Sequence, residues 1–405
     1  MTTAQLGEIA SIVRGIAFPK EDKSAEPLPG HVACLRTTNV QRTVEWEDLW
    51  FVPEKHVKRE EQIVRSGDIL ISTANSYELV GKVAPVTGMP HKATLGAFIS
   101  LIRPNERVDP KFLYHQLAWG KTQSRIRETA STTTNISNVS TKKLLTLEMF
   151  TPPLDEQREI VAELEKQFSR LDEAVANLQR VKANLKRYKA SVLKAAVEGR
   201  LVETEASWKQ STLGDVGTII GGLTKNQKRN DHALKLPYLR VANVYANELR
   251  LSDIEYIGVT ERELEKLLVR KGDLLVVEGN GSPDQIGRVA LWDGSIPNCV
   301  HQNHLIKVRL GAEVLPEWAL TWMLSPTGRH EIEKVSASTS GLHTLSVGKV
   351  SRLPIGVPSV QEQGRIVAEV DRQLSIVREV EAEIDTNLKR AQALRQATLA
   401  KTFQQ

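Results

Sequence analysis

Apolar residues recur at intervals of three and four along two long stretches of the chain. The first stretch runs from Glu156 to Glu198 without proline or glycine, and the second runs from residue 362 to residue 405. This mixture of steps is typical of helices that pair through a narrow apolar stripe. A helix of about 43 residues reaches about 65 Å and cannot bury such a stripe alone. The pattern therefore predicts two long helices that pair with each other, and homodimerisation through them is the alternative.

The helix ends and the pairing seam follow from the same pattern. Pro152 and Pro153 block extension at the front of the first helix, and Gly199 stands where its C-terminal cap belongs. The seam is expected at apolar positions spaced by three or four residues. These positions are Leu171, Val175, Leu178, Leu185, Tyr188 and Val192 in the first helix, and Leu374, Val377, Val380, Ile384, Leu388 and Leu394 in the second.

The chain ahead of each long helix has a different pattern. Short runs of β-forming residues, such as Asp68–Ser72 and Asp273–Val277, lie between glycine, proline and asparagine residues. A helical stretch follows in each case, around Lys111–Glu128 and Glu317–Lys334. These segments therefore predict two mixed α+β domains in which strands dominate.

The two halves of the chain are copies of each other, about 205 residues apart. Six blocks recur in the same order, among them Leu35–Val40 with Leu239–Val244 and Gly67–Ile71 with Gly272–Val276. Such a long-period repeat indicates a tandem duplication. The predicted domains are 1–155, a first helix and linker at 156–206, a second domain at 207–361, and a C-terminal helix at 362–405. Pairing the two helices of such a repeat gives an antiparallel coiled coil and a pseudo-two-fold axis.

Composition and charge narrow the class of protein. The chain of 405 residues has 54 Lys and Arg against 49 Asp and Glu, a formal charge of +5. This small surplus permits a nucleic-acid partner without demonstrating one. Only two cysteines occur, no apolar run approaches a membrane span, and no signal peptide is recognisable. We therefore expect a cytoplasmic protein.

The motifs of common catalytic sites are missing. No phosphate-binding loop occurs, and no Gly-x-Gly-x-x-Gly follows a strand, so nucleotide cofactors have no support. The spacing of Cys299, His301 and His304 permits a metal site, but the first copy offers no matching ligands, and core or surface histidines are favoured. No catalytic set repeats in both copies. We therefore predict no catalytic residues and no metal, and favour a binding protein over an enzyme.

Duplex DNA suits a duplicated binder, because two modules can read two half-sites. Basic residues supply phosphate affinity, and polar residues in loops that differ between the copies can reach base edges. The predicted DNA contacts lie after the Gly-Asp strand and near the start of each copy. They are Arg14, Lys20, Lys23, Asn75, Ser76 and Tyr77 in the first copy, and Lys225, Lys228, Arg229, Asn280, Ser282, Asp284 and Gln285 in the second.

Several motifs carry a resemblance to a known family. The helix start at Pro152–Ile160, the helix end at Leu193–Leu201 and the repeated Leu-Gly, Leu-Arg-x-x-Asn-Val and Gly-Asp blocks resemble those of the specificity (S) subunit of type I restriction–modification systems. The resemblance covers essentially the whole chain. It implies a non-catalytic reader with two target-recognition domains, each of which reads one half of a bipartite duplex DNA target.

The resemblance also implies partners. The two helices would set the spacer between the half-sites and dock two adenine-N6 methyltransferase (M) subunits, which use S-adenosylmethionine. ATP-dependent restriction/translocase (R) subunits, which use ATP with Mg, would complete the complex, and no cofactor is expected on this chain. The alternatives are a specificity module of another restriction type and a coiled-coil scaffold without DNA function.

Overall fold

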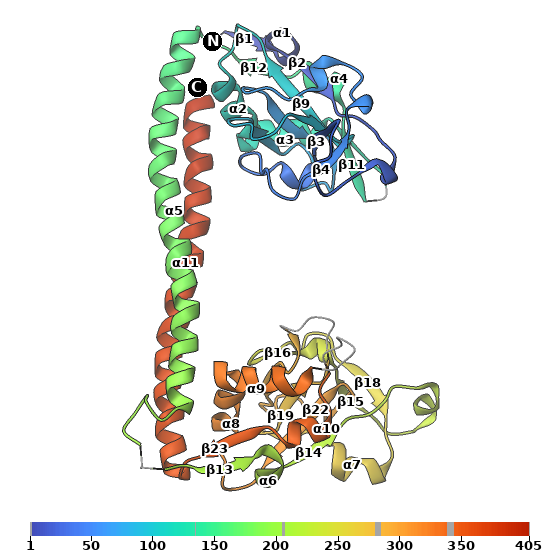
Figure 1. Ribbon diagram of the computed structural model, residues 1–405, viewed down its shortest axis with the longest axis vertical. Helices are drawn as coiled ribbons and strands as arrows, with labels where there is room; N and C mark the ends of the chain where they lie inside the picture. The colour runs from blue at the N-terminus through green and yellow to red at the C-terminus, as the bar shows by residue number, and fades with distance from the viewer. Residues whose placement is uncertain (1, 134, 205–206, 280–284, 338–343, 405) are drawn as a thin grey trace. The chain divides into compact units, whose positions relative to one another are not determined.

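The computed structural model describes residues 2–133, 135–204, 207–279, 285–337 and 344–404. The chain divides into two units, Met1–Leu178 with Thr386–Gln405 and Gln179–Asp385. Two 44-residue helices, α5 (Leu154–Val197) and α11 (Val360–Phe403), each contribute one segment to each unit (Figure 1). Within the described residues, no helix carries an apolar stretch long enough to cross a membrane.

Each globular domain is built on the same two sheets. A four-stranded antiparallel sheet has the order β2-β9-β5-β7 in unit 1 and β14-β22-β19-β20 in unit 2. A three-stranded sheet, with one parallel pair, has the order β4-β3-β8 in unit 1 and β18-β15-β21 in unit 2. The runs predicted as buried strands, β5 and β19, lie inside the larger sheet of each domain. The strand-rich α+β prediction and the internal duplication are therefore confirmed.

The strands of the paired sheets in unit 1 are β2 (Ala10–Arg14), β3 (His31–Leu35), β4 (Trp50–Pro53), β5 (Ile69–Ser72), β7 (Val83–Pro85), β8 (Ala93–Leu95) and β9 (Ile99–Pro104). Their counterparts in unit 2 are β14 (Gly217–Gly221), β15 (Lys235–Leu239), β18 (Glu255–Gly258), β19 (Leu274–Val277), β20 (Val289–Leu291), β21 (Val300–His301) and β22 (Leu305–Leu310).

Shorter elements complete each domain. In unit 1 they are β1 (Thr3–Gln5), α1 (Leu6–Ile9), β6 (Ala74–Asn75), α2 (Pro110–Ala118), α3 (Gly120–Glu128), β10 (Ala130–Thr133), β11 (Ile136–Val139), α4 (Thr141–Leu145) and β12 (Glu148–Phe150). In unit 2 they are β13 (Lys209–Thr212), α6 (Leu213–Val216), β16 (Val244–Tyr245), β17 (Glu248–Leu249), α7 (Glu261–Leu267), α8 (Pro316–Leu324), α9 (Pro326–Ser336), α10 (Val347–Ser351) and β23 (Pro354–Val357).

The helical stretch predicted in each domain is two helices rather than one. The break falls at Trp119 in unit 1 and at Ser325 in unit 2, and both residues have extended backbone. In unit 2 Pro326 disfavours the helical conformation at Ser325, whose hydroxyl instead accepts a hydrogen bond from Gly328 N and caps α9. Apolar spacing alone does not reveal such a break.

A buried glutamine fastens each long helix to its domain. The Gln157 side chain accepts a hydrogen bond from Asp109 N at 2.8 Å and donates to Pro152 O at 2.7 Å. Gln363 makes the same pair of bonds with Leu315 N at 2.8 Å and Pro358 O at 2.9 Å. The repeated Glu-Gln block is therefore a structural anchor at the start of each helix.

The long helices pair antiparallel within each unit. In unit 1 Asp172 of α5 accepts from Arg395 of α11 at 2.5 Å, and Phe168 shares a core cluster with Leu399 and Phe403. In unit 2 Lys182 of α5 binds Asp385 of α11 at 2.5 Å, and Lys189 binds Glu381 at 2.6 Å. Further along α5, Val192 shares a core cluster with Ile366 of α11. Residue numbers rise along α5 as they fall along α11, which confirms the predicted antiparallel pair.

The predicted seam positions differ in burial. Val192, Val377 and Ile384 are buried, and the remaining predicted positions apart from Tyr188 and Leu394 are half-buried. Tyr188 is 48% exposed, although its hydroxyl donates to Gln373 of α11 at 2.8 Å.

The seam prediction is wrong for Leu394, which is 57% exposed. The inward row of α11 at this level contains Ala391, Arg395 and Leu399. Leu394 precedes Arg395 by one residue, which rotates its side chain by about 100° away from that row.

Candidate nucleic-acid interface

The repeated Gly-Asp block holds each domain together. Asp68 is buried and accepts two hydrogen bonds from the Arg103 guanidinium, both at 2.8 Å. Asp273 accepts two from Arg309, at 2.7 and 2.6 Å. These bonds raise the pKa of both arginines. Such bidentate pairs join strand β5 to β9 and β19 to β22, so the shared block belongs to the scaffold.

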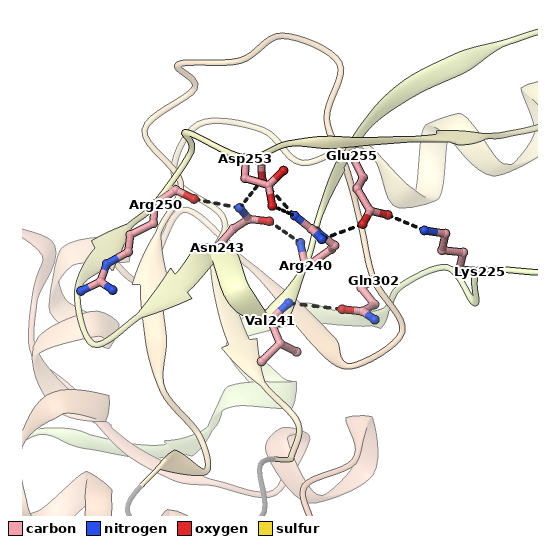
Figure 2. A network of polar contacts seen from close by, with 8 residues as sticks. All are labelled: Lys225, Arg240, Val241, Asn243, Arg250, Asp253, Glu255 and Gln302. Carbon is pink, nitrogen blue, oxygen red and sulfur yellow. Dashed lines mark hydrogen bonds and ion pairs between the residues drawn. The ribbon is translucent and has the colours of Figure 1, made fainter. Parts of the chain in front are cut away.

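The repeated Arg-x-x-Asn block shapes a loop at the edge of the smaller sheet. In unit 2 the Asn243 side chain accepts from Arg240 N at 2.8 Å and donates to Arg250 O and Asp253 O (Figure 2). In unit 1 Asn39 makes the equivalent bonds with Arg36 N and with the carbonyls of Glu45 and Glu47. The asparagine is thus a structural residue in both copies.

The arginine of this block forms an equivalent ion pair with an aspartate in each copy. Arg36 forms an ion pair with Asp48 at 2.6 Å, and Arg240 forms one with Asp253 at 2.7 Å. In unit 2 Arg240 also binds Glu255 at 2.6 Å, and Glu255 accepts a further bond from Lys225 (Figure 2). Each guanidinium is therefore fixed in place beside a position that differs between the domains.

Strand register identifies that position. Cys34 lies opposite Trp50 in the β3–β4 pair, and Tyr238 lies opposite Glu255 in the matching β15–β18 pair. Trp50 and Glu255 therefore occupy equivalent places. In unit 1 the Arg36 Cζ atom lies 4.3 Å from the centroid of the Trp50 ring, and Lys23 Nζ lies 4.2 Å from it. An aromatic site with two cations replaces the charged network of unit 2.

A cavity of about 570 Å³ opens beside Trp50 in unit 1. We call it the Trp50 cavity. Its wall consists of Ile16, Ala17, Phe18, Lys20, Lys23, Cys34, Arg36, Thr37, Thr38, Trp50, Gly96, Ala97, Phe98 and Ile99. Two of the predicted DNA contacts, Lys20 and Lys23, are therefore brought together at this site.

The other predicted contacts of unit 1 lie on neighbouring elements. Asn75 of β6 is paired with Ser137 of β11, and Tyr77, two residues further along, is 55% exposed. Ser76 is half-buried, and its backbone N–H donates to the Asn75 side chain. The backbone carbonyl of Phe98 accepts bonds from Thr73 N and Ala74 N, so the rim of the cavity adjoins β6.

Arg14 lies at the end of β2, where its guanidinium donates to Thr141 Oγ1 at 2.9 Å. Its contact with DNA stays a prediction, as do those of the other residues named.

The predicted contacts of unit 2 are in part engaged with their own domain. Lys225 binds Glu255, while Lys228 is exposed. Arg229 donates to both oxygens of Glu263, at 3.2 and 2.9 Å, and this pairing lowers the pKa of the Glu263 carboxyl to about 2. The Arg229 guanidinium is committed to these bonds inside the fold.

The remaining predictions for unit 2 concern the loop after β19. The side chain of Gln285 accepts a bond from Arg288 at 3.1 Å. Asn280, Ser282 and Asp284 lie outside the described residues. Their contacts with DNA stay predictions.

The Cys-His spacing of the second copy has local partners instead of a shared centre. His301 is buried and its Nδ1 lies 2.8 Å from Leu305 O, while Nδ1 of His304 lies 2.8 Å from Glu278. Among the described residues, no three His, Cys, Asp or Glu side chains gather as a group that could hold a metal.

Sequence reasoning missed Trp50, Phe98 and Arg36 as site residues. The available signal was the comparison of the copies, since the Gly96-Ala97-Phe98 stretch corresponds to Gln302-Asn303-His304. The parallel bridges Ile16–Gly96 and Leu223–Gln302 fix this correspondence. Exposed Phe98 therefore corresponds to the polar residue His304, and the surfaces of the two copies differ in chemistry at this position.

Comparisons with known proteins match both halves of the chain. A family model described as the type I restriction modification DNA specificity domain matches residues 1–186 and again residues 205–390. The type I restriction enzyme EcoKI specificity subunit of Escherichia coli strain K12 is 26% identical over 99% of this chain and 88% of that protein. The StySPI specificity subunit of Salmonella potsdam is 25% identical with the same two coverages.

Solved structures share the fold. A chain from a structure on complex assembly and conformational transition of the type I R-M system matches with a TM-score of 0.73 and 18% identity, over 99% of this chain and 97% of that one. The HsdS subunit from Thermoanaerobacter tengcongensis matches with a TM-score of 0.52 and 19% identity, over 99% of this chain and 96% of that one.

Proposed function

The chain belongs to the type I restriction–modification DNA specificity family, and on this premise we propose that each of its two domains reads one half of a bipartite duplex DNA target. As a specificity subunit the chain is a reader and not itself an enzyme. The observation that carries the proposal is one scaffold present twice with two different surfaces. The Asp–Arg and Arg–Asn contacts recur in both domains. At the equivalent position beside the repeated arginine, however, the first domain has Trp50 and the second has Glu255.

The paired helices have a separate part in the proposal. They set the number of base pairs between the two halves of the target, and they dock two adenine-N6 methyltransferase subunits. Apolar side chains of the helices, among them Val181, Ile376 and Leu394, are exposed and can be covered by such partners. The restriction/translocase subunits join through the methyltransferases.

The proposal also assigns cofactors and location. S-adenosylmethionine is bound by the methyltransferase subunits, and ATP with Mg by the restriction subunits, so this chain requires none of them. A reader of genomic DNA acts where that DNA is, which places the complex in the cytoplasm.

Sequencing of methylated bases tests the proposed function. Genomic DNA is compared between a host that carries this gene with its methyltransferase partner and the same host without this gene. The proposal predicts a gene-dependent motif with two short specified halves, unspecified base pairs between them and methyladenine in both halves. A soluble complex with the methyltransferase that leaves no gene-dependent motif would contradict it, and a scaffold without DNA function predicts that result.

A further inference from the structure

The Trp50 cavity is enclosed on its inner side by groups that carry no charge. Ile16 and the Cys34 thiol are buried at its base, and burial raises the pKa of Cys34 to about 12, so the thiol is neutral. The Phe18 and Trp50 rings meet edge to face with their centroids 6.3 Å apart. A large apolar, aromatic hollow of this kind favours a flat and weakly polar ligand.

The rim of the cavity has the opposite character. Exposed Lys20 and half-buried Lys23 line it, the charge of Arg36 is paired with Asp48, and among the wall residues that the structure describes none carries a carboxylate. Phe98, also on the rim, is 62% exposed, which leaves its ring face available for stacking. Cations around an aromatic hollow suit a ligand that joins a flat ring to an anionic group, as a nucleotide does.

The second domain fills the same place with its own side chains. Tyr238, which corresponds to Cys34, is fully buried and donates its hydroxyl hydrogen to Leu223 O at 2.8 Å. Gln302, which corresponds to Gly96, accepts a bond from Val241 N at 3.2 Å (Figure 2). Glu255 stands in the place of Trp50. The cavity therefore depends on small residues that only the first copy has at Cys34 and Gly96.

We propose that the Trp50 cavity takes one nucleobase of the first half of the DNA target out of the base stack. The inference rests on the proposed function and deepens it. The cavity extends inward to Cys34 and Ile16, whereas a paired base shows a groove-binding protein only its edge. Phe98 stacks on the extruded base, and Lys20 and Lys23 neutralise the flanking phosphates. The matched network of unit 2 offers charged and amide groups, so the second domain reads its half through these groups instead.

A binding experiment with mismatched DNA tests the proposal. It uses the complex with its methyltransferase partner and DNA duplexes that contain the bipartite motif identified by methylation sequencing. In each duplex one base of the first half is left mismatched by changing the base that pairs with it on the other strand. Extrusion of a base breaks its pair, so a mismatch at that position removes part of the cost and tightens binding by about tenfold or more. The methylated adenine serves as an internal reference, because methyltransferases flip their target base.

Two variants link the effect to the cavity. Phe98→Ala removes the exposed stacking ring, and Gly96→Gln introduces the residue that the second domain carries. A Cβ added at Gly96 meets Leu35 O at 3.4 Å and Cys34 Sγ at 3.8 Å, which are ordinary contact distances. Both variants are expected to abolish the gain in affinity that a mismatch causes at the base bound by the cavity. The gain in affinity caused by a mismatch at the methylated adenine should be unchanged. Tyr256→Ala, at an equally exposed aromatic residue of unit 2, is the control and should change neither.

The outcomes are separable. If every mismatch in the first half other than that at the methylated adenine weakens binding, no base enters the cavity and the proposal is overturned. If the two variants lose the methyltransferase subunit instead, the cavity holds a protein segment, which also overturns it. If the wild-type complex does not prefer any bipartite sequence, the proposed function itself has failed.

Discussion

Three kinds of side chain shared by both repeats use their polar atoms inside the fold. Asp68 binds Arg103, Asn39 binds three backbone groups, and Gln157 joins a long helix to its domain. The repeat blocks can be found from the sequence, but these roles cannot, because each bond joins residues far apart or closes a loop. The repeated residues therefore form the scaffold, and under the proposed function the residues that differ between the copies carry the specificity.

The site itself was predictable only in part. Lys20 and Lys23 follow from charge and position, and the structure places both at the Trp50 cavity. Trp50 and Phe98 reach that cavity through the β3–β4 pair and through the bridge between Ile16 and Gly96. Neither long-range contact leaves a periodic signal in the sequence, so a local pattern could not bring these rings together.

Buried His301 predicts an acid-sensitive unit 2. Burial lowers the pKa of His301 to about 4, and its Nε2 has no hydrogen-bond partner among the residues that the structure describes. The unfolded chain takes up a proton near pH 6.5 while the folded unit does not, so stability is full above about pH 6.5 and is lost as the pH falls toward 4. Between pH 7 and pH 5 this group should remove about 2 kcal/mol of unfolding free energy.

Denaturant unfolding at the two pH values measures this loss. His301→Gln should reduce the difference between pH 7 and pH 5 by about 2 kcal/mol, because its amide does not titrate. His304→Gln, at a histidine whose side chain is 56% exposed, is the matched control and should behave as wild type. An unchanged pH dependence in His301→Gln would assign the acid sensitivity to other groups.

At the scale of elements, periodicity located the long helices but not every detail of them. The three-and-four spacing placed α5 and α11 to within two residues at their starts. It did not separate Val377, which is 2% exposed, from Leu394, which is 57% exposed. The neighbouring Arg395 lies in the inward row instead, where its guanidinium donates to Asp172 and stacks on the Phe168 ring. A rule that admits only apolar residues to a seam overlooks such an arginine.

Aspartate substitution distinguishes these two positions. Val377→Asp buries a charge between packed helices and should lower the unfolding free energy of unit 2 by about 3 kcal/mol. Leu394→Asp leaves its charge in water and should change the stability of unit 1 by less than about 0.5 kcal/mol. The midpoints of denaturant unfolding report both effects. Equal losses at the two positions would show that Leu394 is part of the seam.

At the scale of the whole molecule, the duplication makes the two domains equivalent in how they attach. Gln157 and Gln363 bind matching backbone groups at the start of their helices. The cores beneath them are built on sheets of the same order. The globular domain of one copy should therefore fold correctly when it is joined to the long helix of the other copy. Duplication was visible in the sequence, whereas this interchangeability follows from the matched anchors.

The most direct test of the account is the methylated motif produced by a chain that carries the second domain twice, with residues 207–361 in place of residues 1–155. The motif is determined by sequencing methyladenine in a host that supplies the methyltransferase partner. If each domain reads one half, the original second half stays and the first half is replaced by a copy of it. A motif whose first half is unchanged, or whose second half also changes, would contradict the account.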